Sequence, residues 1–480
     1  MNMPSPPAPG NDVRATDADA PAQDTSIPLA KSKVENGPKG GFTKGPVGKH
    51  LLRLGAFMAM GSLTMNVAQL AEAVYLGIVG TEALAAMGFA FPLTITLFAF
   101  AGGIGTGASS VIARAAGAGD QATTRQLVTH AQLLAVVIGA LLAILGGAFA
   151  ELIVRALGAE GLVLQMTVSY LQVYMWGVPF FLLSIVGSTM LRATGAAASP
   201  GIIMTASSVL QIALGPVLIF GWFGAPEMGV AGAALAYVLS RVASVGLYVA
   251  LLIRARMFYW SFENLVGSWL SILHVGGPAI LSGLIHPISM LVVTRLLAGH
   301  GHEVVAGYNV ATRVETMAHM ILWSASSSAE PFIGQNWGAR QIDRIRQAQS
   351  IVYRFCLAWG AITFVFMSLF GAYFVSLIDD DAVVGAVARA FFLVIPLTIG
   401  MMGVMQVASS SFNARGKPIP PLIMTMARIF VLYIPLCYVG DYLLGYMGIF
   451  IATGIVNIVM GAVAWYWNKI SLRERNLAVE

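Results

Sequence analysis

Twelve apolar stretches follow one another between residues 51 and 470, and each is longer than the roughly 20 residues that an α-helix needs to cross a bilayer. The chain is 57% hydrophobic and only 10% charged, whereas soluble domains carry about 25% charged residues. A large soluble core is therefore disfavoured, and we predict an all-α membrane protein. The predicted spans are 51–79, 83–115, 126–155, 163–190, 201–222, 229–254, 268–299, 304–334, 348–377, 383–411, 419–440 and 448–470.

Lys and Arg are concentrated in alternate loops. If the N-terminus lies inside, the inner loops carry most of the bases, and the outer loops carry acids such as the Asp379-Asp380-Asp381 run. Arg155 and Arg389 are the outer exceptions. Positive loops face the cytoplasm, so we expect both termini there.

The two halves of the chain repeat each other at an offset of 221 residues. Six helices per half is an even number, so both halves enter the membrane in the same direction, related by a pseudo-twofold axis along the membrane normal. Two such lobes face each other around a central cleft, and rocking them exposes the cleft to each side in turn, as transporters require. The matching pairs are Gly80 with Gly301, Gly117 with Gly338, and Gly195 with Gly416.

We therefore expect four parts along the chain. The first 45 residues are rich in Pro, Ala, Asp, Lys and Gly without an apolar run, which is typical of disorder. This segment lacks the hydrophobic core of a cleaved signal peptide. The predicted parts are a cytoplasmic tail at 1–45, an N-lobe at 46–256 with spans one to six, a C-lobe at 257–472 with spans seven to twelve, and a C-terminal tail at 473–480.

Away from the ends of the spans, only three of the 22 acids fall inside apolar segments, namely Glu72, Glu315 and Glu330. A charge at the bilayer centre costs on the order of 3 kcal/mol, and such groups mark functional sites. Glu72 has no base near it in sequence. Burial favours the neutral form of a carboxylic acid, which suits a proton carrier, so Glu72 is the first candidate for ion coupling. The alternative is a structural Glu held by polar neighbours.

Other polar side chains of the first half are candidates for the cavity wall. Asn66 and Gln69 precede Glu72 at intervals of three, so the three share one face of the helix with some drift. Arg241 is mid-span and needs an acid or carbonyls, and Glu72 is one possible partner. A drug site needs broad apolar walls with few polar groups, although aromatic and Met residues in membrane helices more often face lipid or the core. Further candidates for the wall are Gln211, Tyr237, Met290 and Trp323, together with Trp176, Phe180, Phe181, Met317 and Met320.

The second half offers further titratable groups. Glu315 lies one helical turn before His319, so a structural ion pair competes with a coupling role, whereas Arg313 is two residues away and does not face Glu315. Glu330 is expected to be a gate or structural acid that contacts the Arg-rich inner loop. His286 is either a packing residue or a coupling group.

Several classes of protein are disfavoured. The chain has no Walker-type Gly-Lys-Ser/Thr run, so ATP drive is not expected, and no catalytic triad or metal-ligand set stands out. Cys356 and Cys437 lie in apolar stretches and are interpreted as core residues. The Gly103-x-x-x-Gly107 motif is typical of close helix packing.

Four segments carry a resemblance to a known family. They read Gly-Thr-Glu-Ala-Leu-Ala-Ala at 80–86, Leu-Arg-Ala-Thr-Gly at 191–195, Met-Gly-Val-Ala-Gly-Ala-Ala at 228–234, and Glu-Pro-Phe-Ile-Gly-Gln-Asn-Trp-Gly-Ala at 330–339. Together they resemble the multidrug and toxic compound extrusion (MATE) family, and the likeness covers nearly everything from about 49 to 468. The resemblance implies a twelve-helix antiporter that expels organic cations or other amphipathic compounds in exchange for protons or sodium.

The resemblance carries over to individual positions only in part. The acid that many members have in the first helix corresponds to Glu72 here. The Asn and Asp of the fifth helix correspond to Gln211 and Gly215, so that acid is lost, which leaves fewer carboxylates for sodium and favours protons. An acidic position of the seventh helix corresponds to His286, and one of the tenth helix to Gly403.

We therefore expect a proton-coupled (less so a sodium-coupled) antiporter of the bacterial inner membrane that exports organic cations or amphipathic drugs by alternating access. It would need no cofactor beyond the coupling ion, H⁺ or Na⁺. Its partners would be small-molecule drugs and membrane lipids, without nucleic acid, and it would act as a monomer.

One rival is a flippase or exporter of lipid-linked or polysaccharide precursors from the same superfamily. It would be expected to line its cleft with several bases, and Arg241, Arg295 and Arg313 are the bases that we count well inside the helices. A membrane-embedded enzyme is the other rival, and it would need a catalytic constellation that the sequence does not offer.

Overall fold

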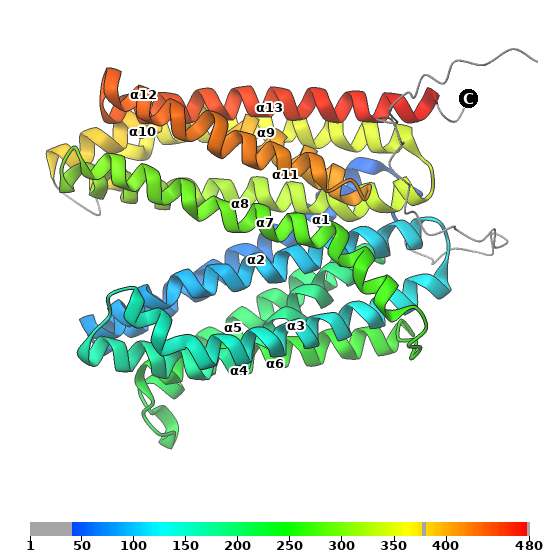
Figure 1. The fold of residues 1–480 in the computed structure, drawn as a ribbon, viewed down its shortest axis with the longest axis horizontal. Helices are drawn as coiled ribbons and strands as arrows, with labels where there is room; N and C mark the ends of the chain where they lie inside the picture. The colour runs from blue at the N-terminus through cyan, green and yellow to red at the C-terminus, as the bar shows by residue number, and fades with distance from the viewer. Residues whose placement is uncertain (1–40, 377–380, 478–480) are drawn as a thin grey trace, which may run out of the picture. The chain divides into compact units, whose positions relative to one another are not determined.

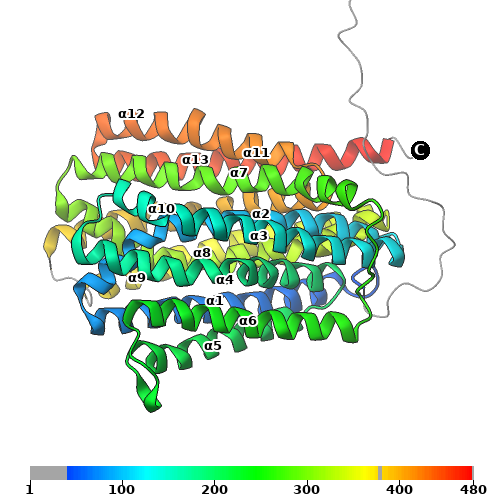
Figure 2. The ribbon, with the colours of Figure 1, turned by 60° about the horizontal axis from the view of Figure 1, so that its bottom comes forward.

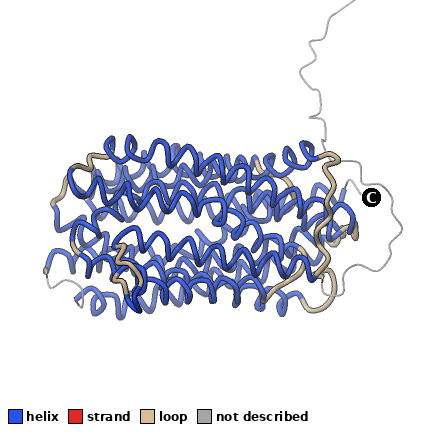
Figure 3. Tube along the Cα trace, turned by 90° about the horizontal axis from the view of Figure 1, so that it is seen from below, coloured by secondary structure: helices blue, strands red, loops and turns tan. Residues whose placement is uncertain are grey.

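The computed structural model describes residues 41–376 and 381–477, and within these ranges the chain forms helices and loops but no strand (Figure 3). The expected tail at 1–40, Asp379 and Asp380 of the outer acidic run, and residues 478–480 lie outside the described residues. The helices are α1 (Val47–Val79), α2 (Thr81–Gly117), α3 (Gln121–Ala156), α4 (Gly161–Ala193), α5 (Ser199–Ile219), η1 (Trp222–Gly224), α6 (Gly229–Arg254), α7 (Leu265–Ala298), α8 (His302–Gly338), α9 (Ile342–Ser376), α10 (Ala382–Ala414), α11 (Ile419–Met426), η2 (Ala427–Tyr433), α12 (Ile434–Leu444) and α13 (Tyr446–Leu477).

The structure confirms an all-α membrane protein with twelve transmembrane helices. In the described ranges, 11 helices are long and apolar enough to cross a membrane, with α11, η2 and α12 forming one continuous span. The remaining crossing is α8, which is 37 residues long but carries Glu, His and Arg side chains. Several helices run past their predicted ends, and α9 begins at Ile342 instead of 348. A helix can extend beyond its apolar residues, because its backbone N–H and C=O groups continue to form hydrogen bonds with each other there.

The helices form two lobes, the N-lobe (α1–α6) and the C-lobe (α7–α13). In Figure 1, α3–α6 lie on one side and α9–α13 on the other, with α1, α2, α7 and α8 between them, and these four helices make most of the contacts between the lobes. The hydrophobic core of the N-lobe includes Ile272 and Ile280 of α7. The core of the C-lobe includes Leu51 and Leu54 of α1. The first halves of α1 and α7 therefore each pack on the opposite lobe.

A reciprocal pair of glycine contacts joins the lobes at the end of the helices where α1 begins, which we call the inner end. A Cβ atom at Gly117 would overlap the Gln335 carbonyl, and a Cβ at Gly338 would overlap the Arg114 carbonyl. Gly338 and Gln335 stand 221 residues after Gly117 and Arg114. The two contacts therefore exchange under the repeat, as a twofold axis requires, and the predicted repeat is confirmed.

The Gly103-x-x-x-Gly107 motif also joins the lobes. A Cβ at Gly103 would lie 2.8 Å from the Gly276 carbonyl oxygen, and a Cβ at Gly107 would overlap the Ile272 carbonyl. The absence of side chains lets α2 approach α7 to backbone contact. The predicted close packing is confirmed, and its partner helix belongs to the opposite lobe.

The last residues of the expected N-terminal tail are packed, which corrects its boundary. Phe42 is buried, its backbone N–H donates to Oε1 of Gln335 at 2.7 Å, and its carbonyl accepts from Arg344 at 2.9 Å. The composition of the tail did not predict the burial of Phe42, because the tail around it consists of glycines and polar residues. One buried aromatic ring is enough to anchor a short segment to a neighbouring surface.

Exposed aromatic side chains mark both ends of the bundle. In Figure 2 the segment between α5 and α6 projects beyond the helices, and its Phe223 is 94% exposed. At the inner end, Trp260 and Phe262 in the loop before α7 are also exposed. Such residues belong at membrane–water interfaces. Arg155, an exception among the outer loops, pairs with Glu151 at 2.7 Å, which balances its charge locally.

Candidate ion-coupling site

Glu72 is buried between three helices of the N-lobe. Its side chain accepts a hydrogen bond from the Tyr170 hydroxyl of α4 at 3.0 Å and another from Nε2 of Gln211 on α5 at 3.1 Å. Each carboxylate oxygen thus has one donor, so the charged form is partly compensated. If Glu72 is protonated, one of its oxygens carries a proton and becomes a hydrogen-bond donor. That oxygen then either loses the hydrogen bond from its present donor or donates its proton to an acceptor. A change of protonation at Glu72 therefore changes the contacts that join α1 to α4 and α5.

Arg241 on α6 forms the second layer of this site. Its Nη2 donates to Oε1 of Gln211 at 3.4 Å, and its guanidinium lies 4.9 Å from the centre of the Tyr237 ring. Because Arg241 has only donors, it fixes the Gln211 amide with oxygen toward Arg241 and N–H₂ toward Glu72. The charge of Arg241 also acts on Glu72. The expected partnership exists, but it passes through Gln211.

Three tyrosines form a stacked column beside the carboxylate. The ring centres of Tyr170 and Tyr174 are 5.7 Å apart, and those of Tyr174 and Tyr237 are 4.8 Å apart. The column holds the Tyr170 hydroxyl against Glu72 at one end and the Tyr237 ring against Arg241 at the other. Stacking of this kind restricts ring movement, so the Tyr170 hydroxyl is held in place against Glu72.

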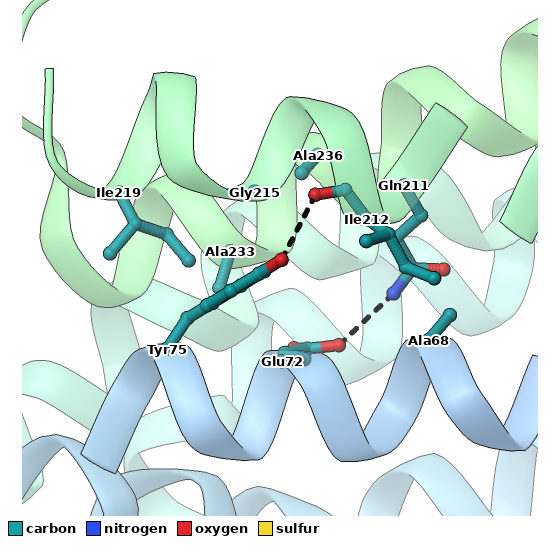
Figure 4. Close-up of a pocket in the computed structure, with 9 residues that line it drawn as sticks. All are labelled: Ala68, Glu72, Tyr75, Gln211, Ile212, Gly215, Ile219, Ala233 and Ala236. Atoms are coloured by element: carbon teal, nitrogen blue, oxygen red, sulfur yellow. Dashed lines mark hydrogen bonds between the residues drawn. The ribbon is translucent and has the colours of Figure 1, made fainter. Parts of the chain in front are cut away.

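A small pocket lies beside Glu72, between α1, α5 and α6 (Figure 4). Its volume is about 10 Å³, taken as the room for the centre of a water molecule, which is about what one water needs. Figure 4 shows the Glu72 carboxylate and the Gln211 amide at one end and the Tyr75 ring at the other. The pocket has room for about one water molecule and is too small for a drug.

The acid that the resemblance expects in α5 has no room in this chain. A Cβ at Gly215 would lie 2.8 Å from the Tyr75 ring, and the Tyr75 hydroxyl donates to the Ile212 carbonyl at 3.4 Å (Figure 4). The aromatic ring therefore fills the space of the missing carboxylate. Glu72 is left as the carboxylate of this cluster within the described residues.

The predicted polar stripe on α1 does not extend into this network. Asn66 donates to the Ser62 carbonyl one turn earlier at 3.1 Å, and Gln69 is exposed. Ala68, not Gln69, lines the pocket with Glu72, because a spacing of three rotates each residue away from the previous one by part of a turn. A role for Asn66 and Gln69 in the central cleft stays a prediction.

The C-lobe contains a different polar cluster around Glu315. No hydrogen bond or ion pair joins Glu315 to another described residue, but the charge of Arg428 acts on it. Arg428 lies in η2, a π-helical segment, and its Nη2 donates to Oδ1 of Asn457 at 3.3 Å. Asn457 in turn donates to Thr398 at 3.2 Å. This cluster therefore holds a fixed positive charge of its own.

Two of the histidines of the C-lobe, His286 and His319, lie near this cluster. Nε2 of His319 lies 2.6 Å from the Gln406 amide nitrogen, so the ion pair of Glu315 with His319 that the helical spacing suggested is not formed. The side chain turns instead toward α10, where a hydrogen-bond partner is available. His286 is exposed on α7 and close enough for its charge to act on His319, and its coupling role stays a prediction.

The resemblance places a further acid in α10, at the position of Gly403, and the packing around Gly403 leaves no room for one. A Cβ at Gly403 would lie 3.0 Å from Sγ of Cys356 and 3.1 Å from Leu322. A carboxylate would therefore have to displace buried apolar atoms. In the described structure there is therefore no room for an acid at position 403.

Glu330 contacts the N-lobe, and not the Arg-rich inner loop that the sequence suggested. The charge of Arg192 at the end of α4 acts on it, and Ser109 of α2 lies beside it. One carboxylate oxygen of Glu330 is buried without a hydrogen-bond partner in the described part of the chain. Its helix packs against α1 and α2 of the N-lobe, so Glu330 lies on the seam between the lobes.

The predicted drug-contact residues divide into two groups. Met290, Met317, Trp323 and Trp176 are exposed, whereas Phe181 is buried in the N-lobe core. Phe181 is therefore a packing residue, because its ring fills space beside Phe98 at 4.8 Å. Arg313 is exposed, and its gating role stays a prediction like those of the exposed side chains.

Two functional candidates were missed from the sequence. Arg428 must be added to the bases inside the spans, since it interrupts the apolar run at 419–440, and that interruption was the signal. Tyr170 lies four residues before Tyr174 on one face of α4, but nothing local links it to Glu72. Within the described residues no group of three or more His, Cys, Asp or Glu side chains is placed to hold a metal ion.

A family model described as MatE matches residues 58–217 and matches again over 278–439. The starts of the two matches differ by 220 residues and their ends by 222, on either side of the 221-residue offset of the repeat. The chain belongs to the multidrug and toxic compound extrusion (MATE) family.

Relatives and solved structures agree with this assignment. A Shewanella oneidensis protein named FAD transporter is 31% identical over 430 residues, which are 89% of this chain and 95% of the relative. A Bacillus subtilis protein named probable multidrug resistance protein YoeA is 26% identical over 80% of this chain and 84% of the relative. The Vibrio cholerae MATE transporter VcmN in the bent form is 27% identical, with a TM-score of 0.86, over 90% of this chain and 98% of that one. MATE proteins are multi-pass membrane transporters and not enzymes, and these relatives support a transporter that acts in drug efflux.

Proposed function

We propose that this MATE protein is a proton-coupled antiporter that exports organic cations and amphipathic drugs across the bacterial inner membrane by alternating access. The observation that carries the proposal is the Glu72 site, in which a buried carboxylate is held by two donors beside a water-sized pocket. A carboxylate in such a place is expected to bind and release a proton. The proposal places both termini in the cytoplasm and needs no cofactor.

The donor set around Glu72 favours a proton over sodium. Sodium is a hard cation that needs several oxygen ligands, as related hard cations do. Tyr170 and Gln211 present O–H and N–H groups toward the carboxylate, and Arg241 adds a positive charge behind them. A proton needs only the carboxylate itself.

Proton binding changes how α1 is held. The neutral acid loses most of its attraction to the donors of α4 and α5, and the Arg241 charge is no longer balanced by the carboxylate. The geometry of α1 relative to its lobe can then change, and α1 also packs against α8 of the C-lobe. This route links the protonation of one side chain to the contact surface between the lobes.

The inner seam is the surface that has to open for substrate entry from the cytoplasm. In the described conformation it contains the reciprocal glycine contacts, the Phe42 anchor and the Glu330–Arg192 neighbours. We propose Glu330 as a gate acid of this seam. Its orphaned oxygen reduces the free energy that holds the gate closed, since an unsatisfied buried acceptor is unfavourable.

A second candidate function is the export of a dinucleotide anion such as FAD. The relative that is 31% identical bears that name, and the structure adds Arg428 to the arginines inside the spans. Arginine is well suited to phosphate groups. Export of lipid-linked precursors is a weaker third possibility, because it needs more bases along the transport path.

Expression in an efflux-deficient bacterium separates these substrate classes. We expect the wild-type protein to raise tolerance to cationic dyes such as ethidium, with extracellular flavin unchanged. A rise in secreted flavin without any gain in dye tolerance would favour the second candidate and remove the first. Glu72→Ala should abolish whichever activity is seen.

A further inference from the structure

A large cavity opens between the inner ends of α9 and α13, far from the Glu72 site. Its volume is about 700 Å³, which lies in the range of small-molecule sites. Both helices pack along α10, but in the described part of the chain they scarcely touch each other. The cavity therefore separates two helices of the C-lobe, and the hydrogen bond from Asn468 of α13 to Tyr353 of α9 joins them at its base.

Four bases surround the cavity. They are Arg346, Arg354, Lys469 and Arg473, and no acid is among the described residues that line it. Arg346 also pairs with Asp343 at 3.3 Å, outside the lining. Nζ of Lys469 lies 4.7 Å from the centre of the Trp465 ring. So many like charges around one hollow repel each other, which a bound anion would relieve.

The floor of the cavity is a buried polar network. Nδ2 of Asn468 donates to the Tyr353 hydroxyl at 2.8 Å, and Nε2 of Gln349 donates to Oγ of Ser411 at 2.7 Å. These side chains are buried and fix the shape of the site. Hydrogen-bonding groups at the base and charges at the rim suit a polar, anionic head.

The apolar part of the lining lies deeper in the membrane. Leu357 and Trp465 line the cavity and are exposed. Leu357 stands three residues beyond Arg354 on α9, and Trp465 stands four residues before Lys469 on α13, so each lies about one helical turn farther from the inner end than the nearest base. The cavity therefore changes from basic at the inner surface to apolar toward the bilayer centre, which is the polarity profile of a lipid.

We propose that this cavity binds an anionic phospholipid of the leaflet at the inner end, with its phosphate among the four bases and an acyl chain along Leu357 and Trp465. Arginine pairs with phosphate through parallel hydrogen bonds, and basic pockets between transmembrane helices suit such headgroups. The bound lipid fills the space between α9 and α13 and thereby stabilises the C-lobe. This site does not depend on the proposed transport activity.

Native mass spectrometry of the full-length protein in detergent tests the proposal, with phosphatidylglycerol and phosphatidylcholine as probes. We expect phosphatidylglycerol to bind at least tenfold more tightly than phosphatidylcholine. The double variant Arg354→Gln/Lys469→Gln should lose about 30-fold in phosphatidylglycerol affinity. Arg254→Gln/Arg256→Gln removes two exposed bases from the same end of the N-lobe and should leave the affinity unchanged.

A second variant keeps every charge and blocks the space. Ser350 lines the cavity, so Ser350→Phe should also weaken phosphatidylglycerol binding while the protein elutes normally from size exclusion. Equal binding of the two lipids, or equal loss in the N-lobe control, would mean that lipid binds to the surface without a site. Displacement of phosphatidylglycerol by an equal concentration of glycerol phosphate would show a soluble-phosphate site and overturn the lipid assignment.

Discussion

At their inner ends the N-lobe and the C-lobe meet through matching glycine contacts, whereas Glu72 of the N-lobe and Glu315 of the C-lobe have different surroundings. Gly117 and Gly338 play the same part in the two lobes. Glu72, in contrast, accepts two hydrogen bonds beside a small pocket, while no hydrogen bond or ion pair joins Glu315 to another described residue and Arg428 places a fixed charge near it.

This difference indicates that the two lobes have different roles in the proposed mechanism. The repeat is kept where two backbones must pass closely, because any side chain there would force the lobes apart. The proposed coupling needs one group that changes charge, and among the described residues the Glu72 cluster combines a carboxylate, positioned donors and room for water. The C-lobe cluster already contains its own cation, so it is suited to a structural or substrate-contacting role.

Replacing the N-lobe acid should give the largest effect. We expect Glu72→Ala to reduce dye efflux from cells to the level of cells without the transporter, because no other described carboxylate lies in its cluster. Efflux of ethidium from preloaded cells, normalised to protein in the membrane, measures this. Glu227→Ala removes an exposed outer acid and should leave efflux intact. Normal efflux by Glu72→Ala would transfer the coupling role elsewhere.

Removing the second-layer base should have a smaller effect. Arg241→Met leaves Oε1 of Gln211 without its donor, and an unsatisfied buried acceptor costs roughly 1–3 kcal/mol. We expect a loss of about tenfold in transport rate at an unchanged amount of protein. The control is Arg254→Met, an exposed base of the same helix. Equal rates in the two variants would show that Arg241 does not position Gln211.

The matched glycines test the symmetry of the lobes. Gly117→Ala and Gly338→Ala should each destabilise the closed inner seam by about 1–3 kcal/mol, since each methyl group overlaps a backbone carbonyl. Thermal unfolding in detergent should show similar decreases in melting temperature for both. Gly102→Ala adds a methyl group where nothing lies within 4 Å and should change little. A large difference between the first two variants would argue against a reciprocal contact.

The C-lobe acid should matter least. Glu315→Gln keeps the size of the side chain and leaves Arg428 bound to Asn457, so we expect transport to fall by about twofold or less. The comparison with Glu72→Gln in the same assay shows which lobe carries the acid that transport requires. If Glu315→Gln stops transport as completely as Glu72→Gln, both lobes carry coupling groups, and the proposed difference in role between the lobes is wrong.

Hydropathy and length were enough to predict the twelve spans, because a membrane helix has to be predominantly apolar over about 20 residues. The repeat followed from three matches at one spacing, and the free-energy cost of a charge in lipid pointed to Glu72. The close packing at Gly103 and Gly107 followed from the absence of side chains. These features are local, so they can be read in short segments of sequence.

The partners of these groups could not be read in the same way. Tyr170 and Gln211 lie 98 and 139 residues after Glu72, and only the packing of α4 and α5 brings them to the carboxylate. The loss of acids at Gly215 and Gly403 was visible, but its cause is the packing of Tyr75 and Cys356. The π-helical turn that positions Arg428 has no clear sequence signal, and neither does the burial of Phe42.

The most direct test of the coupling mechanism uses proteoliposomes in which either a proton or a sodium gradient is imposed. Wild-type protein should transport substrate when only the proton gradient is imposed. The pH of the liposome lumen should change at the same time as the substrate moves. Glu72→Gln, which keeps the shape of the side chain but cannot change charge, should lose both movements. Substrate transport by Glu72→Gln at the wild-type rate, or transport driven by sodium alone, would contradict the account.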